Sequence, residues 1–253
     1  MNTKTPLYSI ITVCFNSQET IGNTLLSINK QTYKNIQHVI IDGGSTDNTL
    51  SIIIEKSRRK NIIISEKDNG IYDAMNKGLG IASGEYISFL NSDDIFANNQ
   101  IVEKVVTSIL KSSSDVAYGN ISFFKDEPNN VKRKWICGKF SSNKLIYGWH
   151  PPHPSLVISR QAFKKTGFFD TKFKITSDYD FMLRLFKLND LKTIYIDETI
   201  VNMRLGGAST SIKGILTSLS EYVMILKKNN FSNYRIILTL ISRYSKKLKQ
   251  INI

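Results

Sequence analysis

The feature that most constrains the fold is a regular alternation of apolar runs and helical spacing through the first half of the chain. Four short apolar runs have the composition of buried strands: Tyr8–Val13, His38–Ile41, Asn61–Ile64 and Tyr86–Leu90. Apolar residues at helical spacing lie between these runs, beginning with Ile21, Leu25 and Ile28. Strands that alternate with helices are typical of a parallel sheet. We therefore predict an α/β fold with a mostly parallel sheet flanked by helices.

Composition limits the class of protein. The chain has 253 residues, of which 41% are hydrophobic and 22% charged, as in an ordinary globular domain. No apolar run approaches the roughly 18 residues of a membrane span. The first strand pattern begins within ten residues of Met1, which leaves no room for a signal peptide. Only two cysteines, Cys14 and Cys137, are present, too few for a disulfide framework or a thiolate metal site. We expect a cytoplasmic protein.

The net charge of +13 is unevenly distributed. Residues 1–100 hold 9 Lys/Arg against 10 Asp/Glu, a net of −1. Residues 101–212 hold 17 against 10, and residues 213–253 hold 8 against 1, a net of +7 in each case. This pattern argues against a nucleic-acid partner and favours a basic face for an anionic membrane or a phosphate-bearing molecule.

Two adjacent carboxylates, Asp93 and Asp94, follow the Tyr86–Leu90 run directly. Open α/β sheets bind ligands at the carboxyl ends of their strands. Like charges this close repel unless a cation neutralises them, and a divalent ion shared with substrate phosphates is the usual solution. The alternative is a turn or a helix cap, which Asp and Asn also favour.

Several motifs in order then carry a resemblance to a known family. They are Thr12–Asn16, Ile41–Asp47, Asp68–Gly78, Gly84–Tyr86 and Leu90–Asp94. Together they resemble the successive signatures of glycosyltransferase family 2, over about residues 7–205. The resemblance implies a GT-A fold with a Rossmann-like sheet, in which residues 1–100 bind the nucleotide sugar and residues 101–212 form the acceptor half. It also implies inverting transfer from a nucleoside-diphosphate sugar with a divalent metal, Mn²⁺ or Mg²⁺.

The resemblance assigns roles at the donor side. Asp94 is the expected metal ligand, and Asp93 is expected to face the ribose or share the ion. The other expected donor-binding residues are Thr12, Phe15, Asn16, Asp42, Asp68, Asn76 and Lys77. Lys77 has an alternative as a solvated helix-surface lysine. One departure matters, because Gly43 stands where the common pattern has a second aspartate, which puts uridine as the base in doubt.

A second catalytic element is expected at Asp178. Inversion requires a base to take the acceptor hydroxyl proton, and a carboxylate in a secluded cleft can do this. The family places an aspartate there, commonly after a glutamate, and Asp178 matches it although Ser177 replaces the glutamate. Asp180 is the fallback. The alternative is that Ser177 and Asp178 only cap a helix.

Acceptor contacts are expected at Trp149 and His153, within a proline-rich segment that fixes an extended or turning backbone. The Trp149 ring could stack on a sugar, and His153 resembles a family position that borders the acceptor. A structural histidine is the alternative. Arg204 is not followed by the histidine that many relatives carry, which removes one possible metal or phosphate ligand.

Residues 213–253 lie beyond the resemblance and predict a basic amphipathic helical extension. Apolar residues recur at helical spacing from Ile237 to Ile251, interspersed with lysines and arginines. Such a helix can lie on an anionic membrane, or it can pack on the catalytic domain with solvated lysines outward.

These observations predict an inverting glycosyltransferase that extends a glycan, or a glycan on a polyprenyl diphosphate, in the synthesis of a surface polysaccharide such as lipopolysaccharide or capsule. A polyprenyl-phosphate sugar synthase and a non-catalytic nucleotide-sugar or polyanion binder are the alternatives. The cytoplasmic face of the inner membrane is a second expected location, and the residues leave the oligomeric state open.

Overall fold

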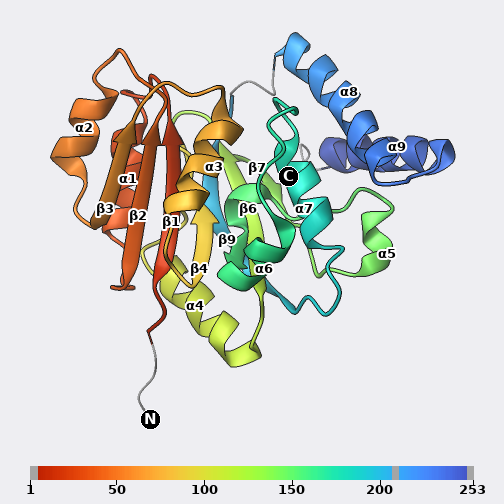
Figure 1. Cartoon of the computed structure of the whole chain (residues 1–253), viewed down its shortest axis with the longest axis horizontal. Helices are drawn as coiled ribbons and strands as arrows, with labels where there is room; N and C mark the ends of the chain where they lie inside the picture. The colour runs from red at the N-terminus through yellow and green to blue at the C-terminus, as the bar shows by residue number, and fades with distance from the viewer. Residues whose placement is uncertain (1–4, 207–210, 250–253) are drawn as a thin grey trace.

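The computed structural model describes residues 5–206 and 211–249. Among these residues, nine strands form one sheet in the order β3-β2-β1-β4-β8-β6-β9-β5, with β7 paired to β6 (Figure 1). The strands are β1 (Tyr8–Cys14), β2 (Ile36–Asp42), β3 (Lys60–Ser65), β4 (Tyr86–Phe89), β5 (Ile95–Phe96), β6 (Val116–Phe124), β7 (Val131–Trp135), β8 (Val157–Ser159) and β9 (Thr193–Arg204).

Helices cover both faces of this sheet (Figure 1). They are α1 (Ile21–Asn29), α2 (Thr49–Lys56), α3 (Ile71–Ile81), α4 (Ile101–Ser112), α5 (Ser142–Leu145), α6 (Arg160–Thr166), α7 (Ser177–Leu185), α8 (Ile212–Lys228) and α9 (Asn233–Lys249), with a 3₁₀ turn at His153–Ser155. The predicted α/β architecture is confirmed.

The first half has the parallel arrangement that the alternation predicts. β1 pairs in parallel with β2 and β4, and β2 pairs in parallel with β3. Side chains of β1 alternate between the faces: Ile11 packs in a cluster with α3, whereas Ile10 packs in another with α4. Gly78 of α3 lets that helix approach β1, because a Cβ there would lie 2.5 Å from Ile11 Cγ2.

The second half of the sheet is mixed. β8 inserts between β4 and β6 and runs antiparallel to both, while β6 and β9 are parallel. The short strands β5 and β7 pair antiparallel at β9 and β6. Strands that are distant in the sequence pair here, so this part of the pairing goes beyond the simple alternation.

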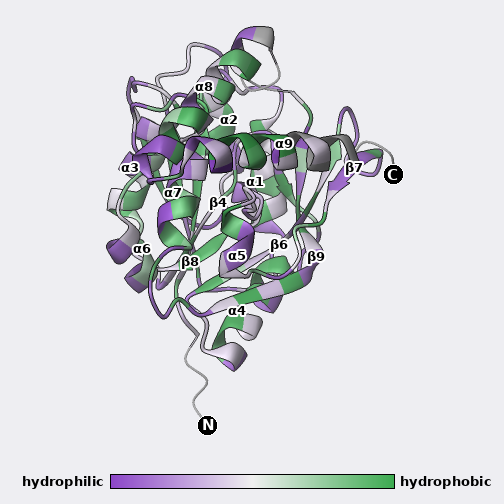
Figure 2. Cartoon of the chain, turned by 90° about the vertical axis from the view of Figure 1, so that its right-hand side faces the viewer, coloured by the Kyte–Doolittle hydropathy of each residue, from purple (hydrophilic) through white to green (hydrophobic). Residues whose placement is uncertain are grey.

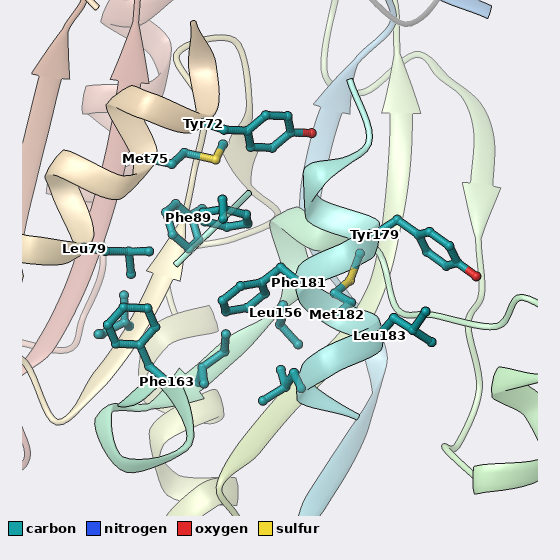
Figure 3. Close-up of a cluster of buried hydrophobic side chains, with 14 of the residues drawn as sticks. Tyr72, Met75, Leu79, Phe89, Leu156, Phe163, Tyr179, Phe181, Met182 and Leu183 are labelled. Carbon is teal, nitrogen blue, oxygen red and sulfur yellow. The ribbon is translucent and has the colours of Figure 1, made fainter. Parts of the chain in front are cut away.

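An aromatic core joins the two halves. Phe89 at the end of β4 contacts Phe169 edge to face, and Phe169 stacks on Phe181 of α7 at 4.6 Å between ring centroids. Figure 3 shows Tyr72 and Met75 of α3 on one side of this core and α7 on the other. The core therefore holds α3 and α7 in fixed positions on either side of the β4 end.

The C-terminal helices pack on the catalytic domain. α9 lies across one face of the molecule (Figure 2). Its inner side buries Ile236 and Thr239, and Thr239 Oγ1 donates to the Ile146 carbonyl at 2.7 Å. Arg243 lies over the Tyr179 ring, 4.6 Å from its centroid. The predicted extension is thus helical and docked along one side.

Ile251, the last apolar residue of the predicted spacing, lies outside the described residues. Among the helices that the structure does describe, none combines the length and the hydropathy needed to cross a membrane.

Candidate active site

The parallel strands end at a common edge, where several predicted donor residues gather. β1 leads directly into Phe15 and Asn16, which are both exposed. The Asn16 backbone N–H donates to Ser45 Oγ at 2.8 Å, which joins the loops after β1 and β2. The hydroxyls of Ser17 and Ser92 lie 2.9 Å apart and join the β1 loop to the acidic segment. An exposed aromatic ring at this edge is suited to stacking on a planar ligand.

The Asp42 carboxylate holds the turn after β2. It is fully buried, and it accepts hydrogen bonds from Ser45 N at 3.1 Å and from Ser65 Oγ at 2.7 Å. A buried carboxylate with several donors stabilises the local backbone. Its contact with a nucleoside stays a prediction.

Gly43 and Asp68 fit together at this edge. A Cβ at Gly43 would lie 2.4 Å from Asp68 Oδ2, so a side chain at position 43 would displace that carboxylate. The Gly70 N–H donates to Asp68 Oδ1 at 2.8 Å and fixes its direction. The departure from the family pattern at position 43 therefore makes room for a carboxylate from the loop after β3.

Asp93 and Asp94, the two carboxylates that follow β4, lie in different environments. Asp94 is 0% exposed, whereas Asp93 is partly exposed. Asp94 Oδ1 accepts from the Arg204 backbone N–H at 3.3 Å, and the Asp94 carbonyl accepts from Thr24 Oγ1 at 2.8 Å. Asp94 is therefore enclosed by the fold, and its role as the metal ligand stays a prediction. Asp93 is the carboxylate that reaches the open edge.

The electrostatics of this pair fit a divalent cation. Burial raises the pKa of Asp93, and the Arg204 guanidinium offsets part of that effect. Burial and the neighbouring Asp93 raise the pKa of Asp94 well above its usual range. No three His, Cys, Asp or Glu side chains among the described residues come together as a metal site. A partly exposed carboxylate such as Asp93 could hold a divalent ion together with ligand phosphates.

Three other predicted donor residues serve the scaffold. The Thr12 hydroxyl is fully buried and lies 2.9 Å from His38 Nε2, inside the sheet. The Asn76 side chain donates to the Phe169 carbonyl and accepts from the Phe169 N–H, each at 2.9 Å. Both side chains have partners within the fold, and their predicted contacts with the donor stay predictions. Lys77 Nζ lies 2.8 Å from Glu66, which agrees with its alternative as a helix-surface lysine.

Asp178 and Asp180 differ in exposure, as Asp93 and Asp94 do. Asp178 lies in the first turn of α7 and is partly exposed; its Oδ1 accepts from Tyr72 Oη at 3.2 Å. Asp180 is 0% exposed and pairs with Arg184 at 2.8 Å and Lys228 at 3.3 Å. Both Asp180 oxygens are paired with cations, so Asp178 is the more accessible of the two. The role of Asp178 as the base, with Asp180 as the fallback, stays a prediction.

The two residues predicted to contact the acceptor, Trp149 and His153, lie in different surroundings. Trp149 is buried among aromatic rings, including Phe140 and Phe186, and its indole N–H donates to the Cys137 carbonyl at 2.7 Å. Trp149 is thus packed within the fold, and its predicted stacking on an acceptor sugar stays a prediction.

His153 is buried between Phe89 and Phe169, yet its Nε2 has no hydrogen-bond partner. Burial lowers the pKa of His153, and the nearby Asp178 offsets part of this effect. A neutral imidazole with an unpartnered nitrogen beside Asp178 is consistent with the predicted acceptor role, which stays a prediction.

Two residues near these carboxylates were not assigned from the sequence. Tyr72 Oη donates to the Ile175 carbonyl at 2.7 Å as well as to Asp178, and burial followed by Asp178 raises its pKa well above its usual range. Figure 3 shows the Tyr72 ring reaching from α3 toward the segment that leads into α7. Arg204 lies beside Asp93. Tyr72 belongs to the Asp68–Gly78 motif, so its position in that motif was the available signal.

Comparison with known proteins agrees with this geometry. The family described as Glycosyl transferase family 2 matches residues 9–187. A PGL/p-HBAD biosynthesis glycosyltransferase of Mycobacterium tuberculosis is 28% identical over 246 residues, which cover 95% of this chain and 92% of that protein. An uncharacterized glycosyltransferase of Haemophilus influenzae is 29% identical over 226 residues, covering 88% of this chain and 89% of that protein.

Solved structures show the same fold. S. aureus TarS 1-349 in complex with UDP-GlcNAc aligns with a TM-score of 0.68 at 20% identity, covering 94% of this chain and 73% of that one. The mannosyltransferase PcManGT from Pyrobaculum calidifontis, in complex with GDP-Man and Mn²⁺, aligns with a TM-score of 0.64 at 15% identity, covering 98% and 72%. The GT-A fold is therefore confirmed, and the chain is a glycosyltransferase that belongs to glycosyltransferase family 2.

Proposed function

We propose that this enzyme transfers a sugar, with inversion, from a nucleoside-diphosphate donor to a hydroxyl of a glycan or lipid-linked glycan acceptor. The observation that carries the proposal is that exactly one member of each aspartate pair is open: Asp93 at the end of β4 and Asp178 at the start of α7. A donor-side carboxylate and an acceptor-side carboxylate are what a direct displacement requires. The nucleotide sugars bound by TarS and PcManGT support the donor class.

At the donor side, Asp93 would hold a divalent metal, with Arg204 next to it as a fixed positive charge. When bound, such an ion stabilises the charge that develops on the leaving diphosphate. The Phe15 ring is free to stack on the base, and Asp68 beside Gly43 offers the base a carboxylate acceptor. Asp94 fastens the acidic segment to β9 through the Arg204 N–H, so Asp93 keeps its direction.

At the acceptor side, Asp178 would accept the proton of the attacking hydroxyl. Tyr72 remains protonated, since its pKa is raised, and its hydroxyl donates to one Asp178 oxygen. That hydrogen bond leaves the other oxygen of the carboxylate for the acceptor. Attack from the Asp178 side, opposite the diphosphate, gives inversion at the anomeric carbon.

The acceptor class is proposed from the relatives and from the site. The mycobacterial relative is named for PGL/p-HBAD biosynthesis, which supports a biosynthetic role for the sugar transfer. His153 Nε2 is an unused polar group near Asp178 that could contact a second acceptor hydroxyl. Synthesis of a surface polysaccharide or glycolipid is the role that we propose on this basis.

The test is a screen of nucleoside-diphosphate sugars by thermal shift, with Mn²⁺, Mg²⁺ or EDTA, because a ligand that binds only the folded state raises its stability. The donor that stabilises the protein is then incubated with glycan, polyprenyl-diphosphate-glycan and polyprenyl-phosphate acceptors. We expect metal-dependent stabilisation and a product of inverted anomeric configuration on a sugar hydroxyl. Transfer to polyprenyl phosphate alone would replace this proposal with the lipid-phosphate synthase alternative, and a retained configuration would contradict the direct displacement.

A further inference from the structure

The helix α8 carries a buried carboxylate that contacts the segment in front of Asp178. Glu221 is the only acidic residue among residues 213–253, and it is buried. Its carboxylate accepts the backbone N–H groups of Lys174 at 2.6 Å, Ile175 at 3.0 Å and Thr176 at 2.9 Å. Thr176 Oγ1 donates a fourth hydrogen bond at 2.8 Å. Three successive N–H groups that converge on one anion form a rigid arrangement.

This segment determines where the base lies. Thr176 is the N-cap of α7 and makes no side-chain cap of its own, so Glu221 supplies the negative group that the helix start favours. The carbonyl of Ile175 accepts from the Tyr72 hydroxyl, which also contacts Asp178. Glu221 is therefore linked to both groups that surround the base carboxylate.

A second contact between α8 and α7 supports the same conclusion. Lys228, at the end of α8, lies 3.3 Å from the buried Asp180 and 3.0 Å from Asp170. The two helices are thus joined both before and within the first turn of α7. Nothing in this pattern requires Glu221 to meet the substrate, since its oxygens are occupied by Lys174, Ile175 and Thr176.

We infer that Glu221 is a positioning residue for the Asp178 base, which makes α8 of the C-terminal extension part of the active site. This inference rests on the proposed role of Asp178. Misplacing a reacting group by about 1 Å can lower a rate about 100-fold. Loss of the Glu221 contacts should therefore affect turnover and leave the donor side, which is built from other elements, unchanged.

The test compares Glu221→Gln with Ser220→Ala, an exposed neighbour on the same helix. In Glu221→Gln an amide NH₂ group replaces one of the two carboxylate oxygens. It cannot accept hydrogen bonds from the backbone N–H groups that this oxygen serves in the wild type. We expect kcat of Glu221→Gln to fall about 10- to 100-fold with unchanged donor Kd, together with faster amide hydrogen exchange at residues 174–176. Ser220→Ala should match the wild type in all three measurements. If Glu221→Gln does not fold, Glu221→Asp keeps the charge and should show the same kcat loss to a smaller degree.

A folded Glu221 variant with wild-type kcat would overturn the inference, whatever its melting temperature. Asp178→Asn, measured beside it, separates this failure from a failure of the proposed function. If Asp178→Asn is inactive and Glu221→Gln is fully active, only the positioning role is wrong. If Asp178→Asn keeps full turnover, the base assignment falls and the inference falls with it.

A different observation concerns the outer side of α9. Opposite the docked side, Tyr234, Ile237 and Ile241 follow one another at helical spacing and are 71%, 57% and 62% exposed. Arg235 beside them is also exposed. Residues 213–253 carry a net charge of +7 in the sequence, of which Lys228 is paired with Asp170 and Asp180 and Arg243 lies on the docked side. We define these three apolar residues as the α9 outer face. Figure 2 shows α9 lying along the surface of the molecule.

We propose that the α9 outer face docks on a membrane that contains anionic lipid. Large apolar side chains beside basic residues match the two layers of such a surface, the acyl boundary and the phosphate headgroups. The helix is already folded and held by its inner side, so docking requires no ordering of the chain. A lipid-bound acceptor would then be presented at the same surface.

The test uses the double variant Ile237→Ser with Ile241→Ser, and Ile54→Ser as the matched control. Ile54 is 66% exposed on α2, at the opposite end of the molecule (Figure 1). We expect the wild type and the control to co-sediment with phosphatidylglycerol vesicles and not with phosphatidylcholine vesicles, and added salt to weaken binding. The double variant should bind at least about tenfold less with an unchanged melting temperature.

Equal binding of the double variant and the wild type, or no binding by either, would overturn the proposal. A second copy of the chain is the competing occupant. If sedimentation velocity shows a dimer that the double variant abolishes, while vesicle binding is absent, the face is a contact between copies.

Discussion

The two aspartate pairs of this enzyme are built in the same way and neutralised differently. In each pair one carboxylate is open and the other fully buried: Asp93 with Asp94, and Asp178 with Asp180. Buried Asp180 has two cationic partners, Arg184 and Lys228. Buried Asp94 is held by neutral donors, and its pKa is raised by burial and by Asp93.

The difference indicates what each buried member does. Asp180 fastens α7 to α8 through Lys228, so its removal leaves Arg184 and Lys228 without this partner. Asp94 fastens the end of β4 to β9, where a neutral side chain of the same shape can do the same. In both pairs the buried member is held within the fold, and the partly exposed one is accessible to ligands.

The largest expected effect comes from the acceptor-side pair. Asp178→Asn removes the group that accepts the proton, so the transfer rate should fall by about 10²- to 10⁴-fold with donor affinity unchanged. Asp180→Asn should keep turnover within a few-fold in the folded protein. Rates with the donor identified by thermal shift, normalised to folded protein, check both. If Asp180→Asn is the inactive variant, the assignment of the base to Asp178 is wrong.

Tyr72→Phe tests how the open member of that pair is held. The substitution removes the hydroxyl that donates to Asp178 and to the Ile175 carbonyl. A hydrogen bond of this kind to a charged group corresponds to about a tenfold change in rate. We expect that loss in kcat, with KM for the donor unchanged. An increase in donor KM with unchanged kcat would place Tyr72 on the donor side instead.

The stability of Asp180→Asn sharpens the contrast between the buried members. Removing one partner of the Arg184 and Lys228 ion pairs should lower the free energy of unfolding by about 1–3 kcal/mol, a value reduced because both cations are partly exposed. Asp94→Asn should change it by less than about 1 kcal/mol. Urea unfolding of the two variants at one pH measures both values, and a larger loss for Asp94→Asn would reverse the account.

A buried polar group away from the pairs, His38, gives an effect that depends on pH. Burial lowers the pKa of His38 from 6.5 to about 3, beside Thr12. Between these two values the His38 side chain is protonated in the unfolded chain and neutral in the folded chain. The contribution of this group to the free energy of unfolding is therefore fully present above pH 6.5 and is lost as the pH falls. The loss from this group between pH 6.5 and pH 5 should be about 2 kcal/mol. Urea unfolding of His38→Gln should show a smaller acid dependence than the wild type, and an equal dependence would exclude His38 as its source.

The sequence predicted the parallel half of the fold because that half is local in pattern, with each strand followed by its helix. It did not predict that β8 lies between β4 and β6, since pairing of distant strands leaves no periodic signal. Charge spacing located both aspartate pairs. It could not tell Asp93 from Asp94, because their difference depends on Arg204, which is 110 residues away. The role of Glu221 could not be predicted either. Three of its hydrogen bonds come from backbone N–H groups about 45 residues away, and the type of a residue does not reveal such contacts.

The most direct test of the account is a calorimetric titration of nucleoside diphosphate and Mn²⁺ into the wild type, Asp93→Asn and Asp94→Asn. The central claim is that the open carboxylate of each pair meets the ligand and the buried one supports the fold. It predicts that Asp93→Asn loses the metal-dependent part of nucleotide affinity, while Asp94→Asn keeps affinity close to that of the wild type. Loss of metal-dependent affinity in Asp94→Asn with full retention in Asp93→Asn would contradict it.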